Sequence, residues 1–331
     1  MSSSTFGVTL RDDAFEAHVR DRLAEIERGL ARAIDAEEPL IAEAATHLLR
    51  AGGKRFRPLL VLLAAEFGDS TAADIVPAAV VVELTHLATL YHDDVMDEAA
   101  LRRGAESANA RWDNSIAILT GDYLFARASR VVADLGPEAV RIQSDTFSRL
   151  VQGQIRETAG PRPGADALSH YLSVVADKTG SLIATSARFG AMMAGAPRTV
   201  QHALTEFGER IGSAFQLSDD IIDVASDSDD SGKTPGTALR EGVPTLPTLL
   251  AQASREPRDN RLRELLSRPI GDDGEHTEAL GLLRQHSALD EAREFVRTRS
   301  DEARALLADL PAGAARDGLE SLCDTVVTRI R

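Results

Sequence analysis

Six aspartates form two copies of one short pattern that suits a divalent cation. The string His92-Asp93-Asp94-Val95-Met96-Asp97 contains D-D-x-x-D, which returns as Asp219-Asp220-Ile221-Ile222-Asp223. On a helix the first and fifth residues of this pattern lie one turn apart on the same face, where like charges repel. One copy alone fits a solvated acidic helix end equally well, but two copies that each follow an apolar segment favour a metal site. Mg²⁺ binds one or two carboxylates together with water and substrate phosphate, so the predicted metal ligands are Asp93, Asp94, Asp97, Asp219, Asp220 and Asp223.

Local groups of cations accompany this acidic pattern and suit an anionic ligand. Three cations lie in Gly52-Gly53-Lys54-Arg55-Phe56-Arg57-Pro58, and others lie in Arg102-Arg103-Gly104, Lys178-Thr179 and Gly232-Lys233-Thr234. Guanidinium and ammonium groups hold diphosphates through charge-assisted hydrogen bonds. The spacing of a Walker A loop is absent. Each cation taken singly fits a surface ion pair as well as a ligand contact.

The elements that must position these residues are predicted to be helices. Apolar residues recur at steps of three and four from Phe15 to Ile34, which is the period of a helix. We predict further helices over 58–67, 74–97, 114–133, 137–157, 165–193, 200–224 and 289–307, and no strand. Breaks are expected at 51–53, 102–104, 160–164 and 227–236. The fold class is therefore all-α, and we interpret residues 1–331 as a single domain whose first ten residues are allowed to be disordered. Residues 255–276 are the one place where a domain boundary or an insertion could lie.

Charge and composition exclude several classes of protein. The chain has 331 residues, 37 Lys plus Arg against 52 Asp plus Glu, and a net charge of −15, which argues against a nucleic-acid partner. Its one cysteine, Cys323, cannot form an intrachain disulfide, so a cytoplasmic location is the default. The most apolar stretch, residues 75–90, is interrupted by Pro77, Glu83 and His86, and the first residues lack the pattern of an export signal. We therefore expect no membrane span.

The motifs taken together resemble those of the trans-isoprenyl diphosphate synthases, or polyprenyl synthetases. The resemblance covers most of the chain and is carried, in the family's order, by GGKRFRP, ELTHLATLYHDDVMDEAALRRG, GDYLFARAS, GQIRE, DKTGSL, FQLSDDIIDV and GKTPGTALREGVPTLP. It implies an isoprenoid synthase-type bundle around a deep central cavity with the two aspartate motifs facing each other across its mouth. It also implies a homodimer that joins an allylic diphosphate head-to-tail to isopentenyl diphosphate, repeatedly and all-trans, with Mg²⁺ as cofactor.

The same resemblance assigns roles to single residues. The six motif aspartates would hold Mg²⁺ and the allylic diphosphate, with Arg102, Lys178 and Lys233 assisting at that diphosphate. Thr179 and Gln216 match positions near the developing allylic cation. Isopentenyl diphosphate would be held by Lys54, Arg57, His86 and Arg103. His92 is interpreted as a hydrogen-bonded structural residue, and no side chain is assigned as general base because the departing diphosphate is expected to take the proton.

The length of the product is predicted from the helix that carries the first motif. Thr89 lies one turn before Asp93 on the same face, and Ala88 precedes it. Neither is bulky, so we predict an open path and a product of more than about four isoprene units for quinone or related biosynthesis, since each helical turn rises about 5.4 Å. Tyr91 would oppose this prediction if it turned into the path. Ala238 stands where the family pattern has Asp. Release of a long lipid also leaves room for transient contact with a membrane.

Other functions remain as alternatives. A geranylgeranyl or farnesyl diphosphate synthase differs only in product length. A metal-dependent phosphohydrolase is suggested by His92-Asp93 but leaves the second motif unexplained. Asp227 to Ala238 begins like an EF-hand loop but has Ala238 where the bidentate Glu is needed. A terpene cyclase would carry a different second motif, and a non-catalytic subunit would not need complete aspartate and basic sets.

Overall fold

The computed structural model describes residues 8–225 and 235–330, which form two compact units. Unit 1 comprises Met1–Ser148, Leu182–Gly208 and Asp309–Ser321, and unit 2 comprises Arg149–Ser181, Glu209–Ala308 and Leu322–Arg331. Three long helices, α7 (Pro137–Ala159), α10 (Arg198–Ala225) and α17 (Ala314–Thr328), contribute residues to both units. The predicted all-α class is confirmed, whereas the single domain and its central cavity stay predictions.

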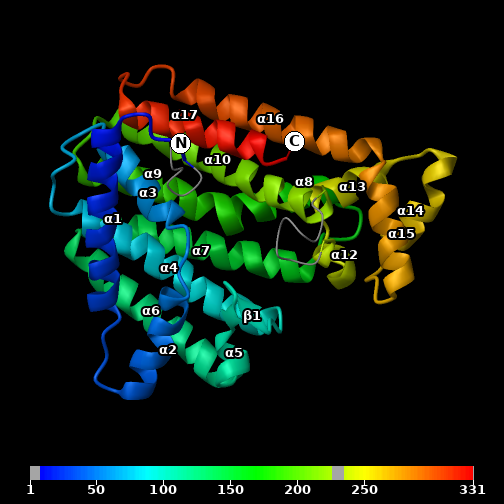
Figure 1. Ribbon diagram of the computed structural model, residues 1–331, viewed down its shortest axis with the longest axis horizontal. Helices are drawn as coiled ribbons and strands as arrows, with labels where there is room; N and C mark the ends of the chain where they lie inside the picture. The colour runs from blue at the N-terminus through cyan, green and yellow to red at the C-terminus, as the bar shows by residue number, and fades with distance from the viewer. Residues whose placement is uncertain (1–7, 226–234, 331) are drawn as a thin grey trace. The chain divides into compact units, whose positions relative to one another are not determined.

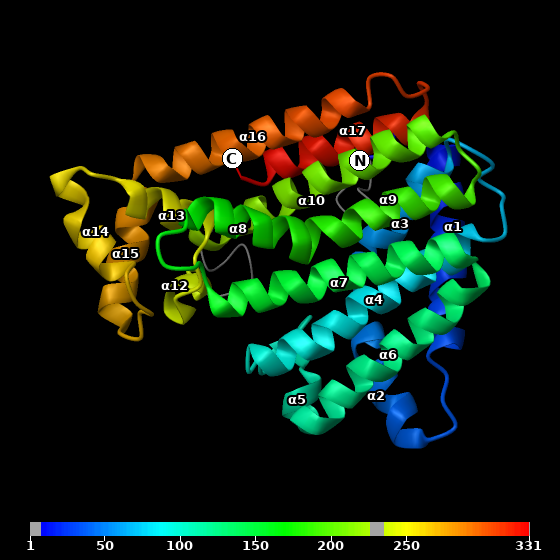
Figure 2. The ribbon, with the colours of Figure 1, turned by 180° about the vertical axis from the view of Figure 1, so that it is seen from behind.

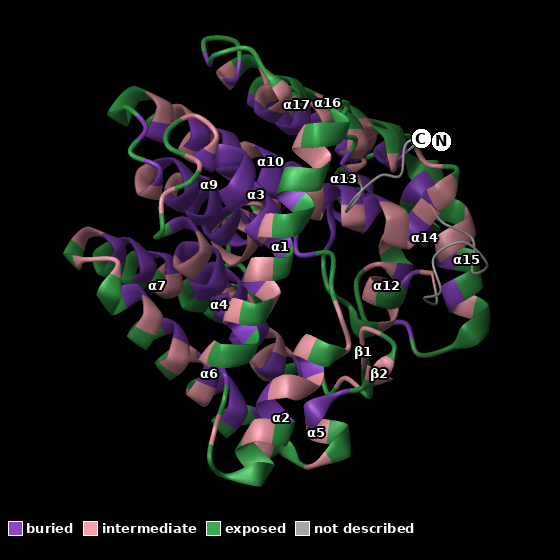
Figure 3. Cartoon of the chain, turned by 60° about the vertical axis from the view of Figure 1, so that its left-hand side comes forward, coloured by how far each residue is buried: buried purple, intermediate pink, exposed green. Residues whose placement is uncertain are grey.

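Unit 1 is built around α4 (Ile75–Met96), an apolar helix whose side chains are mostly buried. It packs against α1 (Asp13–Ala33), α3 (Phe56–Ala65) and α6 (Asn114–Asp134), as Figures 1 and 2 show. Figure 3 shows the buried surfaces of α3 and α4 in purple. The unit also contains α2 (Pro39–Arg50), a short hairpin of β1 (Leu101–Arg102) and β2 (Ala105–Glu106), α5 (Ala108–Arg111) and most of α9 (Ser181–Met193).

Helix α4 is also the one helix among the described residues that is long and apolar enough to cross a membrane. However, 67% of its most apolar window is buried inside the protein. Such burial is typical of the core helix of a globular protein, where apolar side chains are removed from water by their neighbours.

Unit 2 holds the second aspartate motif at the end of α10. Its other elements are α8 (Ala167–Val175), the π-helix η1 (Ala176–Gly180), α12 (Thr237–Glu241), α13 (Leu246–Ala253), η2 (Pro257–Asp259), α14 (Asn260–Leu265), α15 (Asp273–Arg284) and α16 (Ser287–Leu306). Helix α13 packs against α16 and α8, and its start is fixed by a capping box between Thr245 and Thr248. Residues 255–276 lie wholly within unit 2. The division into units therefore does not use that stretch: it crosses α7, α9, α10 and α17, and one further break lies between α16 and α17.

The predicted helices agree with the observed ones to within a few residues, with two differences. Residues 165–193 are interrupted by η1 rather than forming one regular helix, and several helices were not predicted, namely α2, α5, α12, α13, α14, α15 and α17. The prediction of no strand is also wrong, because β1 (Leu101–Arg102) and β2 (Ala105–Glu106) pair antiparallel. Their two-residue turn has positive φ at Arg103 (54°) and Gly104 (77°), which is the backbone that closes a tight hairpin.

The described part of the chain begins with residues that are tied to the rest of unit 1. Val8 and Leu10 are buried, and the backbone N–H of Thr9 donates to Ser321 Oγ at 3.0 Å. Two apolar side chains are thus removed from water within residues 8–10, and the allowance for disorder through residue 10 stays a prediction. Residues 1–7 lie outside the described range.

Candidate active-site residues

The first aspartate motif ends α4, and its three carboxylates differ in burial. Asp94 is fully buried, Asp93 is half-buried and Asp97 is exposed. Arg102 Nε donates to Asp94 Oδ1 at 2.5 Å, and its Nη2 lies 4.0 Å from Asp97 Oδ2. Burial raises the pKa of Asp94, and Arg102 opposes that rise. Asp94 Oδ2 is buried without a hydrogen-bond partner among the described residues, so one acceptor of the motif is free to bind a ligand.

The β-hairpin after this motif carries two arginines that contact different parts of unit 1. Arg102 reaches back to Asp94, whereas Arg103 Nη1 donates to the carbonyl oxygens of Leu48, at 3.0 Å, and Gly52. Gly53 makes room for this arginine, since a Cβ there would lie 2.9 Å from its guanidinium. The turn thus joins the first motif to the glycine loop before α3.

Arg55, the middle cation of that loop, uses its hydrogen-bond donors in contacts within the protein. It is buried, adopts a left-handed backbone (φ 45°) at the N-cap of α3, and donates to Glu27 and to Glu83 Oε1, the latter at 3.1 Å. It also donates to Leu49 O at 3.1 Å. Glu83 is 2% exposed. Arg55 is therefore a structural residue that holds the loop against α1 and α4.

The cations that neighbour Arg55 have fewer contacts with carboxylates than Arg55 has. Arg57 Nε is buried and has no hydrogen-bond partner within residues 8–225 and 235–330. The pKa of Arg57 is lowered to about 10, chiefly by burial; the charge of Glu83 opposes this shift and that of Arg103 contributes to it. Burial and then the charges of Arg57 and Arg103 hold the pKa of His86 well below its usual value, so His86 is neutral. Lys54 is exposed. Of the residues predicted to hold isopentenyl diphosphate, Arg57, His86 and Arg103 are thus brought together.

The residues predicted to control chain length differ in exposure. Ala88 is fully buried, and a Cβ on Gly121 of α6 would lie 3.1 Å from its carbonyl oxygen. Thr89 is half-buried, with its hydroxyl donating to His86 O at 2.8 Å. Tyr91 is fully buried and donates to Ala44 O of α2 at 2.5 Å. Its ring is therefore anchored toward α2, and Thr89 is the more exposed of the two positions predicted to control chain length.

His92 has a structural environment. Its Nε2 lies 3.1 Å from Ile118 O and 3.4 Å from Asp122 Oδ1, and its ring packs against Phe125. A Cβ on Gly121 would lie 2.3 Å from the same ring nitrogen. These contacts agree with the interpretation of His92 as a hydrogen-bonded residue that packs α4 on α6.

The second aspartate motif ends α10, and its members have different partners from those of the first. Asp219 forms an ion pair with Arg329, whose guanidinium also covers the ring of Phe215 at 4.6 Å. Asp220 is buried and accepts from the Tyr171 hydroxyl and from Leu246 N–H, the latter at 3.3 Å. Burial raises the pKa of Asp220 to about 7.

Asp223, the last member, accepts instead from backbone groups. The N–H groups of Thr237 and Ala238 donate to its carboxylate at 3.2 and 3.3 Å. Ala238, the residue that departs from the family pattern, thus contacts Asp223 through its backbone. The contact does not depend on the Ala238 side chain.

The other residues predicted in this region lie in unit 2 as well. Thr179 Oγ1 donates to Gln216 Oε1 at 3.2 Å, and Gln216 Nε2 donates to Asp220 Oδ1 at 3.4 Å. Lys178 Nζ forms an ion pair with Glu157 at 2.5 Å. The structure therefore connects Thr179 and Gln216 to the second motif. Lys233 lies outside the described residues.

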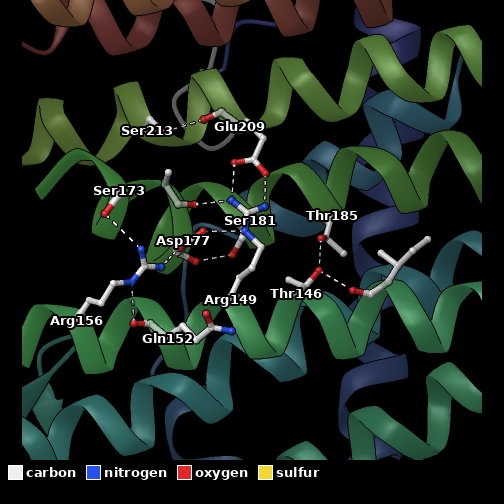
Figure 4. Close-up of polar contacts among 12 residues, drawn as sticks. Thr146, Arg149, Gln152, Arg156, Ser173, Asp177, Ser181, Thr185, Glu209 and Ser213 are labelled. Atoms are coloured by element: carbon white, nitrogen blue, oxygen red, sulfur yellow. Dashed lines mark hydrogen bonds and ion pairs between the residues drawn. The ribbon is translucent and has the colours of Figure 1, made fainter. Parts of the chain in front are cut away.

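A network of charged side chains around η1 was missed by the sequence reasoning. Arg149 and Arg156 of α7 both bind Asp177 of η1, and Arg149 also binds Glu209 of α10 (Figure 4). Figure 4 shows Arg149 between the two carboxylates. The one available signal was the i, i+7 spacing of the two arginines on the predicted helix over 137–157, which places both on one face but does not identify their partners.

Carboxylates that fit a hard cation are present, but they do not form a closed cage. Among the residues that the structure describes, no three His, Cys, Asp or Glu side chains are grouped as a metal site. Mg²⁺ does not require such a cage, because it usually takes one or two carboxylates and completes its shell with water and phosphate. The free Asp94 Oδ2 and the exposed Asp97 fit that mode of binding.

Comparison with known proteins extends these observations to almost the whole chain. The polyprenyl synthetase family model matches residues 38–283. A nonaprenyl diphosphate synthase of Mycobacterium tuberculosis is 49% identical over 98% of this chain and 97% of its own. A geranylgeranyl pyrophosphate synthase of Corynebacterium glutamicum, crystallised with calcium and isoprenyl diphosphate, is 44% identical with a TM-score of 0.88 over 98% of this chain and 99% of its own. A decaprenyl diphosphate synthase of Rhodobacter capsulatus is 33% identical with the same TM-score, over 96% and 99% of the two chains.

Proposed function

Because the chain belongs to the polyprenyl synthetase family and is a prenyltransferase that extends prenyl diphosphates, we propose that it couples isopentenyl diphosphate to an allylic diphosphate with Mg²⁺. The observation that carries this proposal is the pair of D-D-x-x-D motifs together with a surplus of cations around the buried Glu83, of which Arg57 and Arg103 are half-buried. The carboxylates suit divalent cations, and the surplus positive charge suits a diphosphate.

The basic residues of unit 1 supply the site for isopentenyl diphosphate. Arg57 and Arg103 offer guanidinium groups that donate to phosphate oxygens, and Lys54 adds an exposed ammonium group. His86 is neutral beside these arginines and donates or accepts one hydrogen bond without adding charge. Arg55 is left out of this set, because Glu27 and Glu83 already neutralise it.

The aspartate motifs and their neighbours hold the allylic diphosphate. Mg²⁺ bound by Asp93, Asp94, Asp97, Asp219, Asp220 and Asp223 would stabilise the negative charge that develops on the departing diphosphate. Arg102 and Lys178 bring fixed positive charge to that group, and Lys233 does the same in our proposal. Asp219 must exchange Arg329 for this ligand, since the two are paired in the structure.

Thr179 and Gln216 stabilise the allylic cation with oxygen dipoles. Their side chains already lie in hydrogen-bond contact. An allylic cation reacts with water unless it is shielded, so the apolar residues that precede each motif must exclude water from it. No protein nucleophile or base is needed, because the departing diphosphate can take the proton.

We further propose a long product. Thr89 is small and half-buried, and Tyr91 is turned toward α2, so no bulky side chain of this helix is known to block the path. Thr89→Phe should therefore shorten the product, whereas Ala88→Phe should mainly destabilise the protein, because Ala88 is fully buried and overpacking a buried site is costly.

Assembly as a homodimer and a cytoplasmic location complete the proposal. Leu119 and Ile118 of α6 are 62% and 42% exposed, which suits a surface covered by a second copy. Light scattering should then report twice the chain mass, and Leu119→Lys should reduce it. The cytoplasm fits the single buried cysteine, and transient contact with a membrane would assist release of a long lipid.

The decisive experiment supplies purified protein with radiolabelled isopentenyl diphosphate, each allylic primer in turn, and Mg²⁺. We expect a longer prenyl diphosphate that requires both substrates and disappears with EDTA. Asp93→Ala and Asp219→Ala should each lower kcat by about a thousandfold, while circular dichroism stays unchanged. Release of phosphate from isopentenyl diphosphate alone would indicate a phosphohydrolase, and near-normal rates in both variants would refute the proposed site.

A further inference from the structure

The helix that carries Lys178 and Thr179 contains a π-turn immediately at those residues. In η1 the N–H of Ser181 donates to Ala176 O, five residues back, rather than to Asp177 O, four residues back. A π-turn is less stable than the α-helix around it and occurs frequently at functional sites. Something in the surrounding structure must therefore hold it.

The backbone carbonyls of the π-turn are satisfied by side chains. The hydroxyl of Ser181 donates to Asp177 O at 2.6 Å. Arg149 Nη2 donates to Ala176 O at 3.4 Å, so this carbonyl accepts from Arg149 as well as from Ser181 N–H. Figure 4 shows Ser181 and Arg149 close to Asp177. Both carbonyl oxygens thus have a donor that a regular α-helix would not need.

Arg149 also fixes the turn from outside by joining three helical segments. Its Nε donates to Asp177 Oδ1 at 2.8 Å, and its Nη1 and Nη2 form a bidentate pair with Glu209. The hydrogen bond with Glu209 and that with Asp177 raise the pKa of Arg149, so it stays charged. Arg156 binds the other oxygen of Asp177. The side chain of Asp177 therefore has little freedom to rotate.

Two glycines allow the three segments to approach this closely. A Cβ on Gly153 of α7 would lie 2.8 Å from the backbone N of Lys178, and a Cβ on Gly180 would lie 3.2 Å from Glu209 Oε2. Any larger residue at Gly153 would push η1 away from α7. The backbone at Lys178 thus packs directly against α7, and its position along the axis of α7 is fixed.

We propose that Arg149, with Asp177 and Glu209, is a positioning group for prenyl transfer: it holds the π-turn that places Thr179 against Gln216 and Lys178 beside Glu157. This inference rests on the roles proposed above for Lys178 and Thr179. Arg149 itself touches no substrate. If the turn relaxed to a regular α-helix, each residue after it would rotate by about 100° relative to those before it, since an α-helix has 3.6 residues per turn.

The test is Arg149→Gln in the full-length protein, with Arg210→Gln as the matched control. Arg210 and Glu302 form an ion pair at 3.2 Å whose side chains are 39% and 42% exposed, close to the 40% and 31% of Arg149 and Glu209. The control thus removes a similar pair one residue from Glu209, but it does not touch η1. We expect both variants to lose a few degrees of thermal stability.

The kinetic readout separates positioning from folding. Arg149→Gln should lower kcat by about 100-fold, because small misplacements of reacting groups are costly, and leave KM for isopentenyl diphosphate within about threefold. Arg210→Gln should keep kcat within about twofold. Arg149→Lys should recover part of the lost kcat, since one cation–carboxylate contact returns. Equal kcat values in Arg149→Gln and Arg210→Gln, or a loss proportional to the unfolded fraction, would overturn the inference.

A crystal structure of Arg149→Gln gives a readout that does not depend on activity. We expect Ser181 N–H to bond to Asp177 O and the Thr179–Gln216 contact to be lost; an unchanged π-turn with that contact intact would refute the proposal. Ser181→Ala offers the same comparison if Arg149→Gln does not fold. If the wild-type protein fails to couple isopentenyl diphosphate, the proposed function fails, and the structural result still decides the role of Arg149.

Discussion

Each unit contains a cluster of buried and half-buried charged side chains, and the two clusters differ in net charge. In unit 1 the cation cluster (Arg55, Arg57, Arg103 and His86) surrounds the buried Glu83, and Glu27 adds a second carboxylate through its ion pair with Arg55. In unit 2 the clamp (Arg149, Arg156, Asp177 and Glu209) matches two cations with two carboxylates.

The difference is visible in two arginines. Burial lowers the pKa of Arg57, whereas hydrogen bonds raise the pKa of Arg149. A cluster with surplus positive charge is stabilised when an anion binds, because its cations are partly removed from water and have too few carboxylate partners. A balanced cluster has no such surplus and instead fixes the backbone to which it is attached. Charge balance therefore distinguishes a binding site from a positioning network here.

The largest expected effect comes from removing the buried counter-charge. Glu83→Gln should lower the free energy of unfolding by about 3–5 kcal/mol, because it leaves buried arginines uncompensated. Glu209→Gln, in the balanced and more exposed clamp, should cost about 1 kcal/mol or less. Denaturant unfolding of both variants checks the order. Equal losses would contradict the contrast between the clusters.

The next effect concerns substrate affinity. Arg57→Gln should raise KM for isopentenyl diphosphate by about 30-fold, since a hydrogen bond to a charged group contributes about 1.5–3 kcal/mol, and should change kcat much less. Arg111→Gln removes an exposed cation of the same unit that pairs with Glu43, and it serves as the control. An unchanged KM in Arg57→Gln would remove Arg57 from the binding site.

The third prediction uses pH. The pKa of His86 is depressed in the folded protein, so the unfolded state binds more protons at low pH and stability falls as the pH drops through about 6.5, the ordinary value for His. Between pH 6.5 and 5.5 the wild type should lose about 1 kcal/mol relative to His86→Gln, with the loss growing below that. Unfolding titrations of both proteins at three pH values measure the difference. A constant difference would mean that the arginines do not suppress the charge on His86.

The smallest effect is expected at the edge of the clamp. Arg156 is 37% exposed, and its partner Asp177 keeps its bond to Arg149 when Arg156 is removed. Arg156→Gln should therefore lower kcat by less than about threefold, as expected of a partly exposed ion pair. A loss as large as that of Arg149→Gln would show that the two arginines act together on η1.

Much of the fold could be predicted from the sequence, because long helices carry a strong period. The spacing of apolar residues predicted helices over 74–97 and 114–133, and their bounds agree almost to the residue with those of α4 and α6. The hairpin at Arg103 was not predicted, since two-residue strands carry no alternation to detect. The π-turn at Lys178 was not predicted either, because it depends on side chains from α7 and α10 rather than on local propensity.

The sequence by itself determined the repeated aspartates, the cations near them and the helices that carry both, since these follow from residue type and local spacing. Only the tertiary structure decided which charges are neutralised. Arg55 is held by Glu27 and Glu83, each 28 residues away, so Arg57 next to it is left available. The two motifs read alike, yet Asp94 faces an arginine and Asp220 a tyrosine hydroxyl. These ion pairs and hydrogen bonds join different secondary-structure elements. Their partners cannot be read from spacing in the sequence, because residues far apart in the chain can be neighbours in the fold.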